Sequence, residues 1–196
     1  MYGYDSAGYR KRSNNAGFGG ILSLLAAGAL LFSYFVLNWA DLSAAVTSGL
    51  SASERALFQQ NARAAGINLT YNGWDLTQII LEITTTEEVL NMPASGGVID
   101  TQQQPQDYLI VTLPIAGGLG VLLGLVGLFN NIKGGWFLVL IAALGALAYQ
   151  VLDYVRLSDE LPSTIDINTL YQLGFWGAAI SGVLLVIGSF LAMTKN

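Results

Sequence analysis

Residues 108–132 read YLIVTLPIAGGLGVLLGLVGLFNNI, and this run decides the fold because it contains no charged residue. A helix of about 20 apolar residues is long enough to cross the roughly 30 Å hydrocarbon layer of a bilayer. Three further runs without Asp, Glu, Lys or Arg have comparable length, at residues 13–40, 134–152 and 167–194. The sequence therefore predicts an all-α membrane protein built as a bundle of four transmembrane helices.

The chain divides at the ends of these runs. We predict the membrane spans at residues 18–37, 108–129, 136–152 and 170–193. On one side of the membrane, the cytoplasmic side, we place a disordered tail, a turn and a short end, at residues 1–17, 130–135 and 194–196. The other, extracytoplasmic side is expected to hold a long loop and a short loop, at residues 38–107 and 153–169.

Charged residues are sorted by sign between the two sides of the predicted membrane. The side that holds both termini carries one acid, Asp5, and five basic residues, Arg10, Lys11, Arg12, Lys133 and Lys195. The opposite side carries three arginines and twelve acids. Basic residues accumulate on the cytoplasmic side of membrane proteins. This distribution predicts a multi-pass protein of the plasma (cytoplasmic) membrane with both termini in the cytoplasm.

Composition narrows the possible functions. Hydrophobic residues make up 53% of the chain and charged residues 11%, whereas about a quarter of the residues in a soluble domain are charged. Membrane lipids are therefore its expected surroundings. The chain contains no histidine and no cysteine, which are the usual ligands of transition metals and frequent catalytic bases and nucleophiles. We expect no cofactor, no metal and no enzymatic activity, and without a basic patch we expect no nucleic-acid partner.

The long loop contains signals for a small mixed α/β domain. Ser51 followed by Glu54 has the spacing of a capping box, and Gly66 stands where a helix over residues 52–65 would end. Apolar and polar residues then alternate toward Asn72-Gly73, a dipeptide typical of hairpin turns. Asp75 is expected to cap a second helix over residues 76–83.

Small residues recur at helical spacing in two of the predicted spans. They are Gly117, Gly120, Gly124 and Gly127 in the second span and Gly174, Ala178 and Gly182 in the fourth. Such residues form a flat stripe that the backbone of another helix can approach closely. The partner of each stripe is either a helix of the same bundle or a helix of another subunit.

Polar features within the spans are few. No Asp, Glu, Lys or Arg lies inside the four predicted spans, although charges at membrane depth are what usually mark a transport pathway. Gln150, near the outer end of the third span, is expected to form a hydrogen bond with a neighbouring helix. Pro114 is expected to kink the second span.

Two tryptophans complete the outer loop. Trp39 follows the first span, and Trp74 lies within Asn72-Gly73-Trp74-Asp75-Leu76. With four spans, cytoplasmic termini, a long first outer loop and a short second one, this organisation resembles the claudin-like four-span membrane proteins and their first-loop tryptophan signature. The resemblance implies that Trp39 and Trp74 anchor the outer loop and that the protein acts in adhesion or barrier formation. The paired loop cysteines of that family have no counterpart here.

These observations favour a non-enzymatic function. The expected role is that of an integral membrane scaffold, or an accessory subunit of a larger membrane protein assembly, in contact with other membrane subunits or with copies of itself. Glycine-rich helix faces and the outer loop domain are the expected contact surfaces. A claudin-like adhesion or barrier protein is the first alternative, and a carrier of small solutes or lipids is the second.

Overall fold

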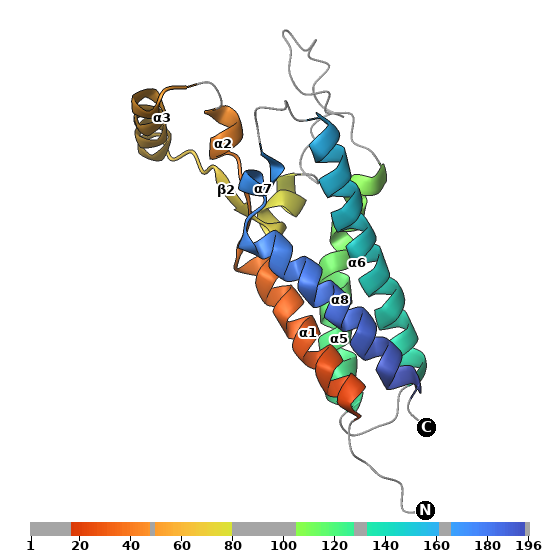
Figure 1. The fold of residues 1–196 in the computed structure, drawn as a ribbon. Coiled ribbons are helices and arrows are strands. Elements are labelled where there is room, and N and C mark those ends of the chain that lie inside the picture. The colour runs from red at the N-terminus through yellow and green to blue at the C-terminus, as the bar shows by residue number, and fades with distance from the viewer. Residues whose placement is uncertain (1–16, 48–49, 80–104, 128–132, 161–165, 195–196) are drawn as a thin grey trace, which may run out of the picture.

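The protein is a bundle of four long helices with a small headpiece at one end (Figure 1). The computed structural model describes residues 17–47, 50–79, 105–127, 133–160 and 166–194. The long helices are α1 (Phe18–Phe35), α5 (Thr112–Gly127), α6 (Lys133–Glu160) and α8 (Leu173–Thr194), and a 3-10 helix, η1 (Pro105–Val111), leads into α5. Four helical segments are long and apolar enough to cross a membrane, which confirms the prediction of four apolar helices of spanning length.

The four helices form a closed ring in which each packs against two neighbours. Helix α1 contacts α5 and α8, while α6 contacts the same two helices from the opposite corner. Successive helices run up and down the bundle, so the start of α1 and the end of α8 lie at the same end (Figure 1). Neighbouring helices are therefore antiparallel throughout.

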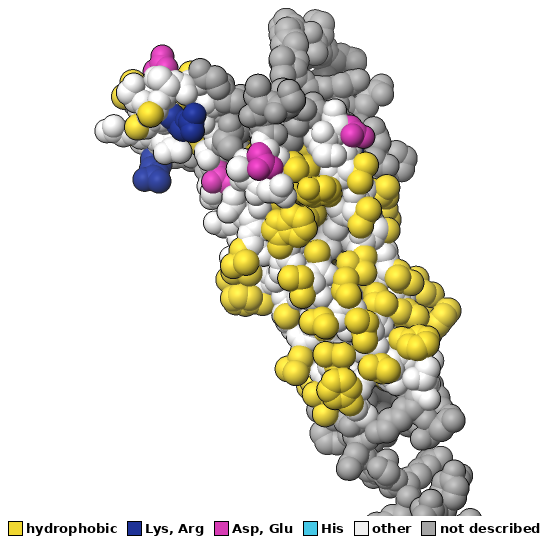
Figure 2. Space-filling model, viewed as in Figure 1, with side chains coloured by type: hydrophobic (Ala, Val, Ile, Leu, Met, Phe, Trp, Pro, Cys, Tyr) yellow, Lys and Arg dark blue, Asp and Glu magenta, His cyan; other side chains and the backbone are white. Residues whose placement is uncertain are grey.

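Burial along each helix follows the helical period. In α6 the buried side chains recur every three or four residues, at Trp136, Val139, Ala143, Ala146 and Tyr149. The opposite faces of the helices expose large apolar side chains. On the face shown in Figure 2 these side chains form an apolar belt along the bundle, whereas the charged side chains lie toward the headpiece end. An apolar belt of this kind would be a liability in water and suits the interior of a bilayer.

The headpiece consists of the segments between the first two long helices. We use this name for β1 (Asn38–Asp41), α2 (Ser43–Val46), α3 (Ala52–Ala64), β2 (Thr70–Asn72) and the helical residues 73–79. Its two strands pair antiparallel, with Ala40 opposite Tyr71 and Asp41 opposite Thr70. The predicted combination of helix and strand in this loop is present.

Helix α3 has the termini that its sequence predicts. The side chain of Ser51 accepts a hydrogen bond from the Glu54 N–H, and the Glu54 carboxylate accepts one from the Ser51 N–H, so both halves of the capping box form. At the other end Gly66 has a φ of 71°, a conformation that glycine adopts without steric cost. These local signals are confirmed.

The Asn72-Gly73 dipeptide does not close a hairpin. Strand β2 pairs with β1, which lies much earlier in the chain, and a helical turn begins at Gly73 instead. Asn72, and not Asp75, is the capping residue: its Oδ1 accepts from the Asp75 N–H at 2.8 Å, and Asp75 Oδ2 accepts from the Asn72 N–H at 3.1 Å. The prediction that Asp75 caps this helix is therefore wrong: the helix begins at Gly73, and Asp75 takes the third helical position, from which its side chain reaches back to the Asn72 N–H.

The third long helix extends beyond its predicted end. We expected the span to stop at residue 152 and a loop to occupy residues 153–169, but α6 continues to Glu160 and a short helix, α7 (Ile167–Leu170), follows. Asp153 and Arg156 occupy successive turns of α6, with Arg156 Nη2 and Asp153 Oδ1 3.5 Å apart. Charges end an apolar span, but paired at this spacing they do not end a helix.

The remaining predictions concern Pro114 and segments that are described only in part or not at all. Pro114 is the third residue of α5, and the helix type changes just before it, from η1 to α5. The predicted tail, the second half of the helix over 76–83, the core of the cytoplasmic turn and the last residues of the chain lie outside the described residues.

Candidate functional site

The glycine stripe of α5 faces α1 within the same chain. A Cβ atom added to Gly120 would lie 2.6 Å from the Cβ of Ala27, and one added to Gly117 would lie 2.6 Å from a methyl carbon of Leu31. At Gly124 the nearest atoms belong to Leu24, the closest 2.9 Å away. Carbon atoms do not approach so closely, so these glycines are required by the contact between α5 and α1.

The remaining predicted small residues also lie against parts of this chain. Gly127 faces the Trp136 ring, Gly182 faces Leu147 of α6, and Ala178 is fully buried. Gly174 packs against the Trp39 ring, and a Cβ added there would come within 2.6 Å of the Asn38 carbonyl oxygen. The two stripes are thus occupied inside the bundle, and neither is open to a second subunit.

The closest helix approach was not among the predicted positions. Gly19 of α1 and Gly188 of α8 lie where the two backbones cross, and a Cβ added to Gly19 would be 2.5 Å from the Ala192 nitrogen. The signal was present in the sequence, because Gly19 and Ser23, like Gly188 and Ala192, are small residues four positions apart. Ser23 is completely buried at this crossing.

The two tryptophans have different surroundings. Trp39 is 1% exposed, donates from Nε1 to the Ser33 carbonyl at 2.8 Å, and meets Tyr34 and Phe175 edge to face. Trp39 thus packs β1, at the base of the headpiece, against the end of α1 and the start of α8. Trp74 is 42% exposed and lies 5.9 Å from the Phe35 ring, so it covers little of the core.

Hydrogen bonds between side chains connect separate elements at the headpiece end of the molecule. The Tyr34 hydroxyl and Thr77 Oγ1 are 2.6 Å apart, which joins α1 to the helical residues 73–79. The Tyr171 hydroxyl donates to Asp153 Oδ2 at 2.6 Å. Burial, and then the neighbouring Asp153 carboxylate, raises the pKa of Tyr171, so its hydroxyl remains a donor at any physiological pH.

Gln150 behaves as the sequence predicts. It lies on α6, is 3% exposed, and donates from Nε2 to the Phe175 carbonyl of α8 at 3.3 Å. The hydrogen bond predicted between this side chain and a neighbouring helix is confirmed. Its partner Phe175 lies in the first turn of α8, where the rings of Tyr171, Phe175 and Trp176 are in contact.

The free edge of the small sheet is closed to strand addition. The N–H of Thr70 donates to Asn68 Oδ1, and the N–H of Asn72 donates to Asp75 Oδ2, both at 3.1 Å. An incoming strand needs unpaired backbone groups on the edge that it joins. Side chains of β2 and its flanks already occupy these two donors.

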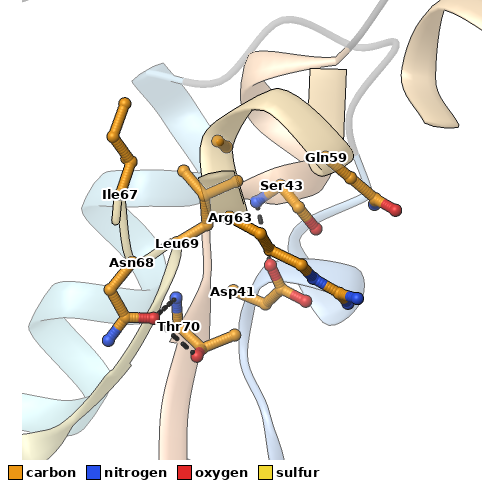
Figure 3. A pocket seen from close by; sticks show the side chains of 9 residues that line it. Asp41, Ser43, Gln59, Arg63, Ile67, Asn68, Leu69 and Thr70 are labelled. Atoms are coloured by element: carbon orange, nitrogen blue, oxygen red, sulfur yellow. Dashed lines mark hydrogen bonds between the residues drawn. The ribbon is translucent and has the colours of Figure 1, made fainter. Parts of the chain in front are cut away.

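A cleft of about 190 Å³ opens between α3 and the sheet. Asp41, Ser43, Gln59, Ala62, Arg63, Ile67, Asn68, Leu69 and Thr70 line it. Figure 3 shows the polar ends of Asp41, Gln59 and Arg63 on one side of the cleft, with the aliphatic side chain of Ile67 on the other. Asp41 Oδ1 accepts a hydrogen bond from the Ser43 N–H at 2.9 Å. Within the described part of the chain, no group of three or more His, Cys, Asp or Glu side chains is placed to hold a metal ion.

Comparison of the chain with protein-family models, with curated proteins and with solved structures gives no match.

Proposed function

We infer that the protein is a non-enzymatic scaffold or accessory subunit of a membrane assembly, which presents its headpiece to another subunit. We place it in the plasma (cytoplasmic) membrane with both termini in the cytoplasm, from the distribution of basic residues. The observation that carries the proposal is the state of α3. This helix stands away from the bundle, and Ala62 is its one buried residue (Figure 1).

An isolated helix of this length is marginally stable in water. Helix α3 has 13 residues, and helices shorter than about 12 to 15 residues need tertiary packing to persist. The capping box supports its first turn. Hydrogen bonds from Ser51 lower the pKa of Glu54. The carboxylate half of the cap therefore weakens only as the pH falls through that lowered pKa. A partner that covers α3 would supply the burial that the chain itself does not.

Large apolar side chains are exposed on α3 and just after it. Leu57 is 58% exposed and Ile67, just after the helix, is 56% exposed. Arg55 and Arg63 lie on the same helix, and arginine with apolar side chains is a common composition for protein interfaces. The glycine stripes pack within the bundle, so we no longer propose them as contact surfaces for another subunit. The headpiece is the surface that we assign to the partner.

The bundle interior supports a scaffold over a carrier. Its described core is made of side chains such as Ala27, Leu30, Ala143 and Leu185, all fully buried. A conducting path needs internal solvation from polar side chains or exposed carbonyls. The buried polar side chains of the long helices are Ser23, Ser33, Gln150, Ser181 and Ser189. Ser23 and Ser33 lie at the contact between α1 and α8, against Gly188 and Gly177, so we expect the bundle to remain sealed.

The experiment compares protein extracted from its native membrane in a mild detergent with two α3 variants. We expect the wild-type protein to migrate with a stoichiometric partner and Leu57→Glu to lose it. Ala52→Glu adds the same charge at an exposed position of α3 that faces away from Leu57, and it is expected to keep the partner. Equal melting temperatures for the purified chains show that the variants fold.

Two other results would favour the alternatives. Selective flux through liposomes that contain the purified protein, with the protein migrating alone, would contradict the scaffold and favour a carrier. Liposomes that stay sealed but adhere to one another through the headpiece would favour the claudin-like adhesion function. If wild-type protein and Leu57→Glu retain the same partner, the assignment of the interface to α3 is wrong.

A further inference from the structure

The cleft between α3 and the sheet has the polar groups of a binding site for a small molecule. Gln59 and Arg63 are four residues apart on α3 and therefore share a face. Asp41 and Ser43 approach this face from β1 and α2. Residues 41–43, helix α3 and residues 67–70 thus line one cleft of about 190 Å³.

Arg63 and Asp41, the two charged side chains of this cleft, do not pair with each other. No ion pair or hydrogen bond involves the Arg63 side chain among the described residues, although Figure 3 shows its guanidinium on the same side of the cleft as the Asp41 carboxylate. One Asp41 oxygen is engaged by the Ser43 N–H. A guanidinium recognises an oxyanion through paired N–H donors, and a carboxylate recognises an ammonium group.

We propose that this cleft binds a small zwitterion of the α-amino acid type. Arg63 binds the ligand carboxylate, with Gln59 as a second donor, and Asp41 binds the ligand ammonium group. Ala62, Ile67 and Leu69 provide the apolar part of the lining. This inference does not depend on the proposed role as a scaffold.

The size of the cleft sets the size of the ligand. Pockets for drug-sized molecules have volumes of about 300 to 1,000 Å³, so a cleft of about 190 Å³ suits a smaller molecule. An amino acid with a short aliphatic side chain meets this limit and places its apolar part against Ile67 or Leu69. A lipid acyl chain or an oligosaccharide does not fit.

The test is a ligand-observed NMR titration of the full-length protein in detergent. The probes are L-alanine and L-valine, with propionate and propylamine as controls that carry one charge each. We expect saturable binding of both amino acids and weaker binding of the two controls. Arg63→Gln and Asp41→Asn should each weaken binding of L-valine about tenfold, because each removes one charged contact.

The variants keep the local structure. Asparagine at position 41 still offers an oxygen to the Ser43 N–H, and glutamine at position 63 has nearly the helix propensity of arginine. Arg55→Gln is the matched control, since Arg55 lies on α3 but does not line the cleft, and it should bind L-valine as the wild type does.

Three results would overturn the proposal. These are the absence of saturable binding for both amino acids, equal affinity of wild type and Arg63→Gln for L-valine, and binding of propionate as tight as that of L-valine. The last result would show a site for anions, in which Asp41 takes no part.

Discussion

Replacement of Gly19 by alanine tests the closest contact in the bundle. The added Cβ would lie 2.5 Å from the Ala192 nitrogen and 2.8 Å from the Gly188 carbonyl oxygen. Both atoms belong to the backbone of α8, so no side chain can rotate away. Ordinary contact begins near 3.4 Å, and the difference from 2.5 Å requires a separation of about 0.9 Å between α1 and α8.

This displacement has a predictable cost. Extra carbon in a packed core destabilises proteins by about 1 to 3 kcal/mol, and the better helix propensity of alanine offsets up to about 1 kcal/mol of it. A net loss of about 1 to 2 kcal/mol corresponds to a melting temperature lower by roughly 2 to 8 °C in a protein of this size. Tryptophan fluorescence in detergent measures it, because Trp39 is buried in the folded protein.

The matched control lies on the same helix. Gly28 has no atom within 4 Å of the position that a Cβ would take, so Gly28→Ala makes the same chemical change without the contact. We expect this variant to melt at or above the wild-type temperature. If Gly19→Ala melts no lower than Gly28→Ala, then the backbones of α1 and α8 do not lie in contact at Gly19.

Replacement of both Gly120 and Gly124 by leucine should force α5 from α1 and lower the melting temperature by more than the Gly19 variant does, since the added side chains meet Ala27 and Leu24. Gly118→Leu is the control, because its position is open; equal loss in both proteins would refute the explanation. The absence of native cysteine allows a test of orientation with single cysteines. Ser53→Cys on α3 should react with a membrane-impermeant thiol reagent in intact cells, and Ser13→Cys only after lysis, whereas the reverse pattern would invert the topology.

The sequence by itself determined the helical bundle and much of its local detail. Four uncharged runs are sufficient to predict apolar helices of spanning length, because hydrocarbon thickness sets a minimum length and excludes charge. The capping box at Ser51 and the glycine at position 66 could also be predicted, because both are local features. Each depends on hydrogen bonds or backbone angles within a few residues, and such interactions leave a signature at fixed spacing.

Only the tertiary structure decided which partners these elements meet. The glycine pattern of α5 was compatible with another subunit until the structure placed Ala27 and Leu31 against it. Asn72 and Asp75 form a reciprocal helix cap, and β2 pairs with β1, a strand that lies about 30 residues earlier in the chain. The cleft likewise needs Asp41 from that strand to face Arg63 of α3. Contacts between distant segments depend on the packing of the whole chain, and no local spacing in the sequence encodes them.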